Sequence, residues 1–239
     1  MRNKNLTFII PAAGKSSRFQ SKESKIFYRY KKKRILNHVI EKCIKFTDRI
    51  IIIVNSQDIQ RIKKITKIYR HIKFTFIIQK KPIGMGHAVY IGLKKVNSIY
   101  SAVIWADQIF LSSITIKKTI KKFLGKKTLF SFPIQKKKDP YTCVIFDKKK
   151  QFKDIIQKRE TDKMPKIGYS DCGFFIFNSE KIKKTLNFCI KKKLIITKKT
   201  KEIDFLKSFK FFSKKGKFEL FKSNYKRDSV GVNYVEDLN

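Results

Sequence analysis

The chain has 239 residues and 42% of them are hydrophobic, which is enough to bury the core of one large domain and excludes a disordered tail. No apolar run approaches the roughly 20 residues that a membrane-spanning helix needs. The formal net charge is +40, from 58 Lys and Arg against 18 Asp and Glu, and such an excess on its own favours a nucleic-acid or anionic-membrane partner.

The distribution of the charge along the chain argues against such a partner. Lysines are scattered through nearly every segment in short runs, and no segment forms a dedicated basic arm or a single basic helix. The chain is also rich in Lys, Ile and Phe, as a strongly biased genome would produce. We expect a solvated basic surface that attracts anionic small molecules such as nucleotides, and we do not expect nucleic acid as the partner. Whether the charge is functional or compositional stays open here, as does the oligomeric state.

The amino-terminal residues and the cysteines indicate in which cellular compartment the protein works. Arg2 and Lys4 precede the apolar run "LTFII", but five residues are too few for the core of a signal peptide. We therefore expect a mature cytoplasmic protein. The cysteines have no CxxC spacing, which favours small buried side chains over a zinc site or disulfides. They are Cys43, Cys143, Cys172 and Cys189.

The first half of the chain alternates between apolar runs and segments of helical periodicity. Expected strands are residues 6–10, 49–54, 73–78 and 101–105, and expected helices are residues 34–46, 57–69, 86–96 and 112–124. The run "RIIIIV" is continuously apolar, which is typical of a strand buried on both faces. This order predicts an α/β fold, a three-layer α/β/α sandwich with a mostly parallel twisted sheet.

The second half is less regular. We expect strands at 128–132, 141–146 and 172–177, helices at 179–192 and 201–209, and a polar loop over 147–171. No Pro/Gly/Ser-rich linker and no internal repeat divides the chain. We therefore expect one domain over 1–239, with a nucleotide-binding half at 1–125 and an acceptor-binding half at 126–239.

The loop after the first strand, "PAAGKSSRF", lies where ligands bind on such sheets, at the carboxyl ends of the strands. It is not a Walker A loop, because that motif needs a glycine at Ile9, and Ala12 and Ser16 exclude G-x-G-x-x-G. Small residues let the backbone approach a ligand, and Arg18 and Lys25 could neutralise phosphates. The alternative is an ordinary turn with surface cations.

Four motifs, in order along the chain, carry a family resemblance. "PAAGKSSRF…SKESK" with "ILNHVI" resembles the first signature of the nucleotidyltransferases with a GT-A-like Rossmann fold. "QKKPIGMGHAV" resembles Q-x-x-P-x-G-T-G-H-A-V, "VIWADQIFL" resembles V-x-x-G-D-x-P-L, and "GVNYVEDL" resembles G-V-N-x-x-x-D-L. Within that superfamily the chain is most similar to the sugar-1-phosphate nucleotidyltransferases, including the N-acetylglucosamine-1-phosphate uridylyltransferase domain.

The resemblance implies roles for particular residues. Asp107 and Asn233 would bind Mg²⁺, Lys25 would stabilise the transition state, and Arg18 would orient the leaving pyrophosphate. Gln79 would read a pyrimidine base, and His87 would be structural. The full set of implied nucleotide-binding residues is Pro11, Ala12, Ala13, Gly14, Lys15, Ser16, Gln79, Gly84, Met85 and Trp105. The chain departs from the pattern where Met85 replaces Thr, Ala106 replaces Gly and Ile109 replaces Pro. For Asp107 and Gln79 the alternatives are a turn or helix-capping residue and a polar strand-end residue.

The acceptor-binding positions match less well. Thr142 replaces a Gly of the uridylyltransferase pattern, Gln157 replaces the Glu that holds the sugar, and Asp171 replaces a sugar-contacting Asn. We expect the nucleotide chemistry to be kept and the acceptor to differ from N-acetylglucosamine 1-phosphate. The chain ends at Asn239, so we also expect no acyltransferase domain of the hexapeptide-repeat type.

The leading interpretation is a Mg²⁺-dependent nucleotidyltransferase that joins an NMP group from UTP, CTP or dTTP to a sugar phosphate for glycan or surface-polysaccharide synthesis. Two alternatives use the same loop: a cytidylyltransferase for phosphocholine or a sugar acid, and a molybdenum-cofactor nucleotidyltransferase, whose G-D-Q-P sequence "ADQIF" resembles. A third is a degenerate, non-catalytic module that binds RNA or anionic lipid.

Overall fold

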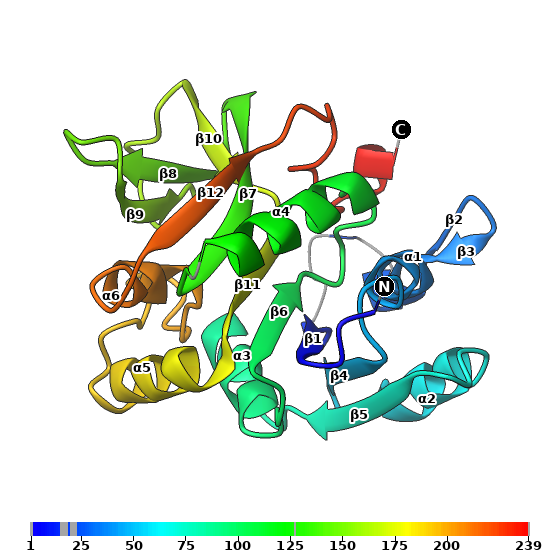
Figure 1. Cartoon of the computed structure of the whole chain (residues 1–239). Coiled ribbons are helices and arrows are strands. Elements are labelled where there is room, and N and C mark those ends of the chain that lie inside the picture. Colours follow the sequence, from blue (N-terminus) through cyan, green and yellow to red (C-terminus); the bar gives the residue numbers. More distant parts are fainter. Residues whose placement is uncertain (1, 15–18, 20–22, 127, 239) are drawn as a thin grey trace.

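The structure is a computed structural model that describes residues 2–14, 19, 23–126 and 128–238. Its centre is a sheet in the order β10-β7-β11-β6-β1-β4-β5, with β12 paired to β7 (Figure 1). The pairs among β5, β4, β1 and β6 are parallel, whereas β11 runs antiparallel to both β6 and β7. The expected mostly parallel α/β fold is confirmed.

The strands of the first half are β1 (Leu6–Pro11), β4 (Arg49–Val54), β5 (Lys73–Ile78) and β6 (Tyr100–Ile104). The helices between and after them are α1 (Ile35–Cys43), α2 (Ile59–Thr66), α3 (Met85–Leu93) and α4 (Ser113–Gly125). Every expected element of this half is present, with ends shifted by a few residues. The hydroxyl of Ser112 accepts a hydrogen bond from the Ile114 N–H at 3.1 Å, which caps the first turn of α4.

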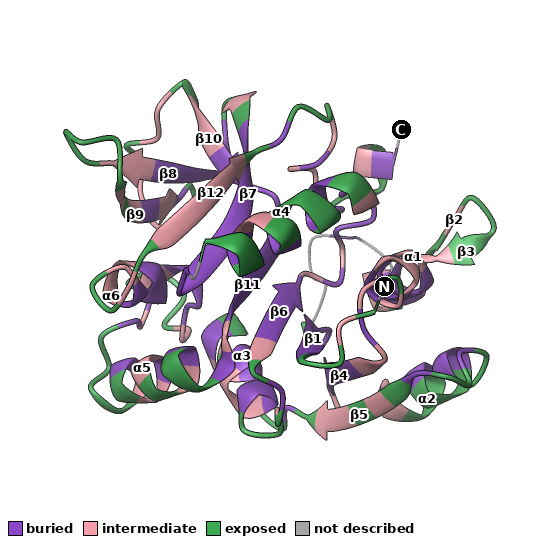
Figure 2. Ribbon diagram, in the orientation of Figure 1, coloured by how far each residue is buried: buried purple, intermediate pink, exposed green. Residues whose placement is uncertain are grey.

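The central strands are buried along most of their length (Figure 2). Their alternate side chains enter two separate cores. Phe8 and Ile10 of β1 pack with α1, α2 and α4 on one face, while Ile9 packs with α3 on the other. Burial on both faces explains why β1 and β4 read as unbroken apolar runs. This arrangement gives the three layers.

The second half contains β7 (Phe130–Lys138), β8 (Thr142–Phe146), β11 (Phe174–Asn178) and α5 (Ser179–Lys191), all of which were expected with approximate bounds. The 147–171 loop prediction is wrong, because β9 (Phe152–Gln157) and β10 (Ile167–Asp171) lie within it. β9 forms a hairpin with β8, and β10 pairs with β7. These two segments are strands because their main chains pair with β8 and β7, and their partly polar sequences do not signal this pairing.

The helix expected at 201–209 is also wrong. Ile203 forms a β-bridge with Ile196, and a 3-10 turn, η3 (Leu206–Ser208), and the short helix α6 (Phe209–Phe212) follow. The Asp204 carboxylate accepts from the Leu206 N–H at 2.7 Å and so starts the turn two residues later. The strand β12 (Phe218–Lys222), the small hairpin of β2 (Arg29–Tyr30) and β3 (Lys33–Arg34), and the turns η2 (Lys25–Phe27) and η4 (Val235–Leu238) were not predicted.

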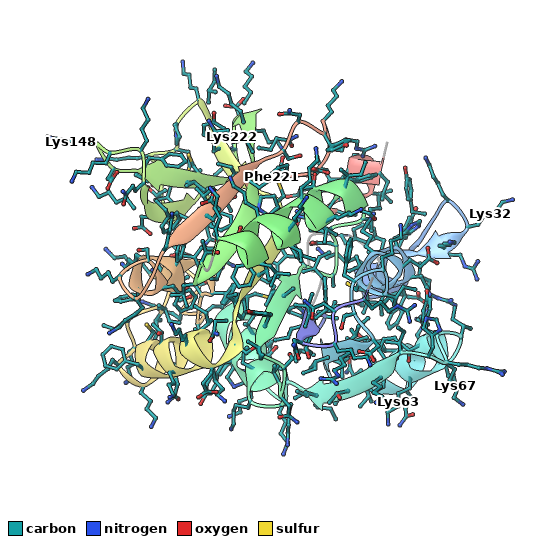
Figure 3. The ribbon with its side chains drawn as sticks, in the orientation of Figure 1. Lys32, Lys63, Lys67, Lys148, Phe221 and Lys222 are labelled. Atoms are coloured by element: carbon teal, nitrogen blue, oxygen red, sulfur yellow. The ribbon has the colours of Figure 1, made fainter. Side chains whose placement is uncertain are left out.

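The basic side chains spread over the surface as expected. In Figure 3 the labelled Lys32, Lys63, Lys67 and Lys148 extend outward from different sides of the ribbon. Among the described residues, no helix combines the length and the apolar character needed to cross a bilayer.

Candidate active site

The candidate site lies at the carboxyl ends of β1 and β6, where a parallel sheet presents its loops. Pro11, Ala12 and Ala13 are buried, and the Ala12 N–H donates to the Ile53 carbonyl at 2.7 Å. The chain then reaches the exposed Gly14, where an added Cβ would meet nothing within 4 Å. Lys15, Ser16 and Arg18 lie outside the described residues, so their predicted roles stay predictions.

Lys25 and Asp107 meet at this edge. The Lys25 ammonium, at the start of η2, lies 2.5 Å from Asp107 Oδ2, and each side chain is only 17% exposed. The same ammonium donates to the Val232 carbonyl at 2.9 Å. An ion pair so shielded from water is stronger than a surface pair. The predicted catalytic lysine and the predicted metal ligand are therefore neighbours.

The carboxyl-terminal motif packs against the same aspartate. The Val232 N–H donates to the main-chain carbonyl of Asp107 at 3.1 Å, which brings Asn233 beside it. The Asn233 and Tyr234 N–H groups donate to the Asp237 carboxylate at 2.7 and 2.8 Å, and the Asn233 amide nitrogen donates to Gly231 at 3.2 Å. That last bond uses the nitrogen of Asn233, whereas its oxygen is the atom that a cation needs. A carboxylate and an amide oxygen are ligands suited to Mg²⁺.

Gln79 belongs to a tightly held turn. The Gln79 side chain is buried, and its amide donates to the Gly84 carbonyl at 3.2 Å and to His87 Nδ1 at 3.0 Å. The 195–204 segment closes the turn from outside, because Ile203 donates to Ile83 and accepts from Gly86, both at 2.8 Å. Gly84 has φ of +111°, a conformation that favours glycine. Met85 follows as an exposed residue at the start of α3.

His87 gives this turn a pH dependence. Burial lowers the pKa of His87 from its ordinary value of 6.5, and the charge of Lys94 lowers it further. The folded chain therefore takes up this proton less readily than the unfolded chain, and the stabilisation present above pH 6.5 is lost as pH falls through and below that value. Protonation would also convert Nδ1 from the acceptor of the Gln79 bond into a donor.

We expect the urea midpoint of the wild type to fall more steeply from about pH 7 to about pH 5.5 than that of a His87→Gln variant. The difference between the two slopes isolates His87 from the carboxyl groups, which titrate in both proteins. Parallel slopes would show that His87 has no depressed pKa.

The Trp105 ring is half-buried among aromatic side chains. Its centroid lies 5.1 Å from that of Phe175 and 6.0 Å from that of Phe205, and the main-chain N–H of Trp105 donates to the Gly173 carbonyl at 3.0 Å. These contacts belong to the core between the sheet and α6. They leave the predicted nucleotide contact of Trp105 a prediction.

The three predicted acceptor-binding residues lie together and already have protein partners. The Thr142 hydroxyl donates to Asp171 at 2.6 Å, and Thr142 is the cross-strand partner of Gln157. Asp171 also accepts from the Gly173 N–H at 2.8 Å. Burial raises the pKa of Asp171, the bonds from Thr142 and Gly173 oppose that rise, and the charge of nearby Asp107 adds to it. The structure therefore joins these residues to the edge that carries Asp107.

Gln157 is held by an ion-pair network. Its amide nitrogen donates to the buried Asp204 at 2.5 Å, and its oxygen accepts from Arg159 at 3.2 Å. Arg159 pairs with Asp204 at 3.2 Å and with Glu202 at 3.0 Å. The charges of Asp204 and Glu202 raise the pKa of Arg159 although burial alone would lower it. Through Ile203, this network connects the acceptor-side hairpin to the Gly84 turn.

Comparison with known proteins identifies the family. Residues 8–167, which include the first strand, the Gly84 turn and Asp107, match the MobA-like NTP transferase domain. The chain belongs to this family. The match to an NTP transferase domain agrees with the superfamily that the four motifs predicted.

The chain is also similar to curated proteins in sequence and to solved structures in fold. The bifunctional protein GlmU of Buchnera aphidicola from Acyrthosiphon pisum is 31% identical over 195 residues, which cover 80% of this chain and 41% of that protein. The chain thus spans about two fifths of that relative. A Bacillus anthracis protein described as a glucose-1-phosphate thymidylyltransferase has a TM-score of 0.76 at 19% identity, over 92% of this chain and 87% of that one.

A further structural neighbour is the inositol-1-phosphate CTP transferase of T. maritima, with a TM-score of 0.75 at 15% identity, over 100% of this chain and 94% of that one. At these identities both solved structures bear on the fold alone. They confirm the nucleotide-diphospho-sugar transferase-like α/β fold for this MobA-like domain.

Sequence reasoning missed three residues of the site in this MobA-like domain. Arg159 and Asp204 are 45 positions apart, and only the return of the 195–204 segment to β9 joins them. Gln108, next to Asp107, is 4% exposed. Its signal was present in "ADQIF", where Gln108 is a second polar residue beside Asp107 in an otherwise apolar stretch.

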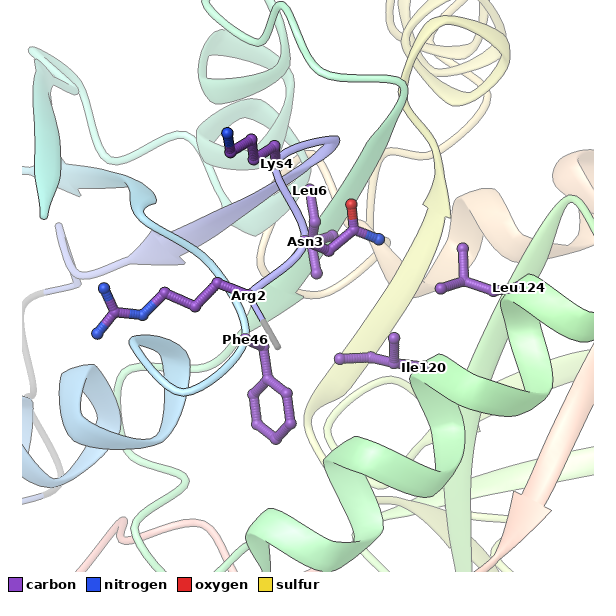
Figure 4. Close-up of a pocket in the computed structure, with 7 residues that line it drawn as sticks. All are labelled: Arg2, Asn3, Lys4, Leu6, Phe46, Ile120 and Leu124. Atoms are coloured by element: carbon purple, nitrogen blue, oxygen red, sulfur yellow. The ribbon is translucent and has the colours of Figure 1, made fainter.

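A pocket of about 380 Å³ lies elsewhere on the MobA-like domain (Figure 4). It is lined by apolar Leu6, Phe46 and Leu124 and by the cationic Arg2 and Lys4. Leu6 begins β1, so this pocket is at the edge of the sheet opposite to Asp107. We assign no part of the nucleotide chemistry to it.

Proposed function

We propose that the chain is a Mg²⁺-dependent nucleotidyltransferase that transfers an NMP group from UTP, CTP or dTTP to a sugar phosphate or related phosphorylated acceptor. The acceptor phosphate oxygen attacks the α-phosphorus, the bond from that phosphorus to the bridging oxygen breaks, and pyrophosphate leaves. Such a reaction asks the protein for positioning and charge neutralisation more than for covalent chemistry. The observation that carries the proposal is the meeting of Lys25, Asp107 and the 231–233 segment at the edge of the sheet where β1 ends.

The proposed roles follow from these positions. Asp107 and Asn233 hold Mg²⁺, which when bound neutralises phosphate charge and orients the triphosphate. The Lys25 ammonium contacts the phosphates of the reacting substrates. Gln79, whose amide is fixed by Gly84 and His87, faces the pyrimidine base. Arg18, from the first motif, orients the pyrophosphate.

The acceptor is proposed to differ from N-acetylglucosamine 1-phosphate. The support is that Gln157 and Asp171, which differ from the uridylyltransferase pattern, are bonded to Asp204 and to Thr142 respectively. The similarity to the bifunctional protein GlmU, of which this chain covers 41%, supports the nucleotide part of the proposal. A single domain with a nucleotide half at 1–125 and an acceptor half at 126–239, located in the cytoplasm, remains part of the proposal.

The test has two stages. A thermal-shift screen of UTP, CTP, dTTP, GTP and ATP with Mg²⁺ ranks the nucleotides, because a ligand that binds only the folded chain raises its Tm. Pyrophosphate release is then measured with the best nucleotide and a panel of sugar 1-phosphates, inositol 1-phosphate and phosphocholine. We expect a pyrimidine nucleotide to give the largest shift and one acceptor to give turnover. A protein that binds RNA with steep salt dependence and releases no pyrophosphate with any pair would contradict the proposal.

A further inference from the structure

Gln108 is buried without the hydrogen bonds that a buried amide requires. Its side chain is 4% exposed, and among the residues that the structure describes its oxygen Oε1 has no hydrogen-bond partner. A buried polar group in this condition costs free energy, because it has given up water and gained nothing in return. Natural chains retain few such groups, and each calls for a reason.

The position of Gln108 suggests the reason. Its amide lies against two glycines: a Cβ added to Gly173 would come within 2.5 Å of Gln108 Cγ, and one added to Gly231 would lie 3.3 Å from Nε2 and 3.4 Å from Asp107 Oδ1. Gly173 lies two residues after the end of the acceptor-side strand β10, and Gly231 begins the closing motif. The amide thus sits between the acceptor side and the proposed metal ligands. Both glycines have a backbone that can approach the amide closely.

The neighbouring polar side chains are already engaged. Asp171 accepts from Thr142 and from Gly173, and Gln157 is bonded to Asp204 and Arg159. These bonds already use part of the hydrogen-bonding capacity of both side chains. Gln108 is the buried amide at the same edge whose oxygen requires a donor, and a hydroxyl or amide of the substrate can supply it.

We propose that Gln108 determines specificity for the acceptor substrate by hydrogen-bonding a polar group of the phosphorylated acceptor. This inference rests on the proposed function of the site. Gln108 is expected to make that bond after rotation of its terminal amide, which packs against Gly173 and Gly231, where no Cβ is present to block it. The energy lost in the unliganded chain is recovered when the acceptor substrate binds.

The competing explanation is that Gln108 only fills space. In that case an apolar side chain of the same length would fill it better, since it removes the unsatisfied oxygen and keeps the shape. The chain offers a matched control in Ser131 of β7, which is fully buried and whose hydroxyl likewise lacks a partner in the described part of the chain. Ser131 lies in the middle of the sheet, opposite Ile176 and Glu219, away from the loops of the site.

The experiment compares Gln108→Met and Ser131→Ala with the wild type in the full chain. Tm is measured first, and KM is then measured separately for the nucleotide and for the acceptor found in the pyrophosphate-release screen. We expect both variants to keep or raise Tm. We expect only Gln108→Met to raise the KM for the acceptor, by about tenfold for the loss of one neutral hydrogen bond, with the KM for the nucleotide unchanged.

Other outcomes overturn the inference. An unchanged KM for the acceptor would make Gln108 a packing residue, and equal losses for both substrates would make it a support for Asp107. If the wild type releases no pyrophosphate with any pair, the proposed function fails on its own. Gln108 is then judged by the thermal shift that glucose 1-phosphate, N-acetylglucosamine 1-phosphate and inositol 1-phosphate each produce. If these compounds shift the Tm of the wild type and of Gln108→Met equally, or shift neither, the proposed role of Gln108 in acceptor binding is overturned as well.

Discussion

Replacing Asp107 with asparagine is expected to lower kcat for pyrophosphate release on the order of 10²–10³-fold, the size of effect seen when one electrostatic contact to a developing charge is removed. Asparagine keeps the shape and one oxygen but removes the negative charge that pairs with Lys25 at 2.5 Å and that the proposed Mg²⁺ requires. Steady-state kinetics at saturating nucleotide and a range of Mg²⁺ concentrations measure the loss. The concentration of Mg²⁺ at half-maximal rate should rise as well.

The matched control is Asp48→Asn. Asp48 also lies beside a basic residue, Arg49, at 3.8 Å, but it precedes β4 at the opposite edge of the sheet. This ion pair is half-buried, with Asp48 31% exposed, but at 3.8 Å its geometry is poor and it lies far from the Lys25 ammonium and the proposed metal ligands. We expect Asp48→Asn to keep the wild-type kcat and Mg²⁺ dependence. Near-normal turnover in a folded Asp107→Asn variant would remove the basis of the proposed metal site.

The layers of this fold could be predicted because their signals are local. β1 and β4 are buried on both faces, so nearly all of their residues are apolar. α1 repeats its apolar residues at helical spacing because one face covers the sheet. β10 and β12 carry no such signal. β10 contains Gly168 and Ser170 and is a strand only because β7 pairs with it.

The 195–204 segment is a second case in which long-range pairing, and not local sequence, determines the structure. Residues after Lys201 have the composition of a helix, yet Ile203 is drawn into main-chain bonds with Ile83 and Gly86, more than a hundred positions earlier. For the site, the motif pattern supplied Asp107 and Asn233, and the structure brings both to one edge. Arg159 with Asp204 could not be predicted, because a long-range ion pair has no sequence spacing of its own.

Replacing Gly84 with alanine is expected to destabilise the chain by about 2–4 kcal/mol, the sum of backbone strain and overpacking. Gly84 has φ of +111°, and an added Cβ would lie 2.8 Å from the Ile203 nitrogen and 2.9 Å from the Glu202 Cβ. The main chain at Ile203 is fixed by its hydrogen bonds to Ile83 and Gly86, so it cannot move away from the added Cβ without breaking them. The turn must open instead. Nucleotide binding should weaken with it, because the Gly84 carbonyl holds the Gln79 amide.

Gly125 provides the contrast for this substitution. It is the last residue of α4, and an added Cβ there would meet nothing within 4 Å. Gly125→Ala should therefore stabilise the chain by roughly 0.4–1 kcal/mol, through the lower entropy of the unfolded chain. Urea unfolding of both variants measures the two opposite signs, and the thermal shift with the preferred nucleotide and Mg²⁺ separates folding from binding. If Gly84→Ala proved as stable as Gly125→Ala and kept the full nucleotide shift, the 195–204 segment could not be what holds the base-binding turn.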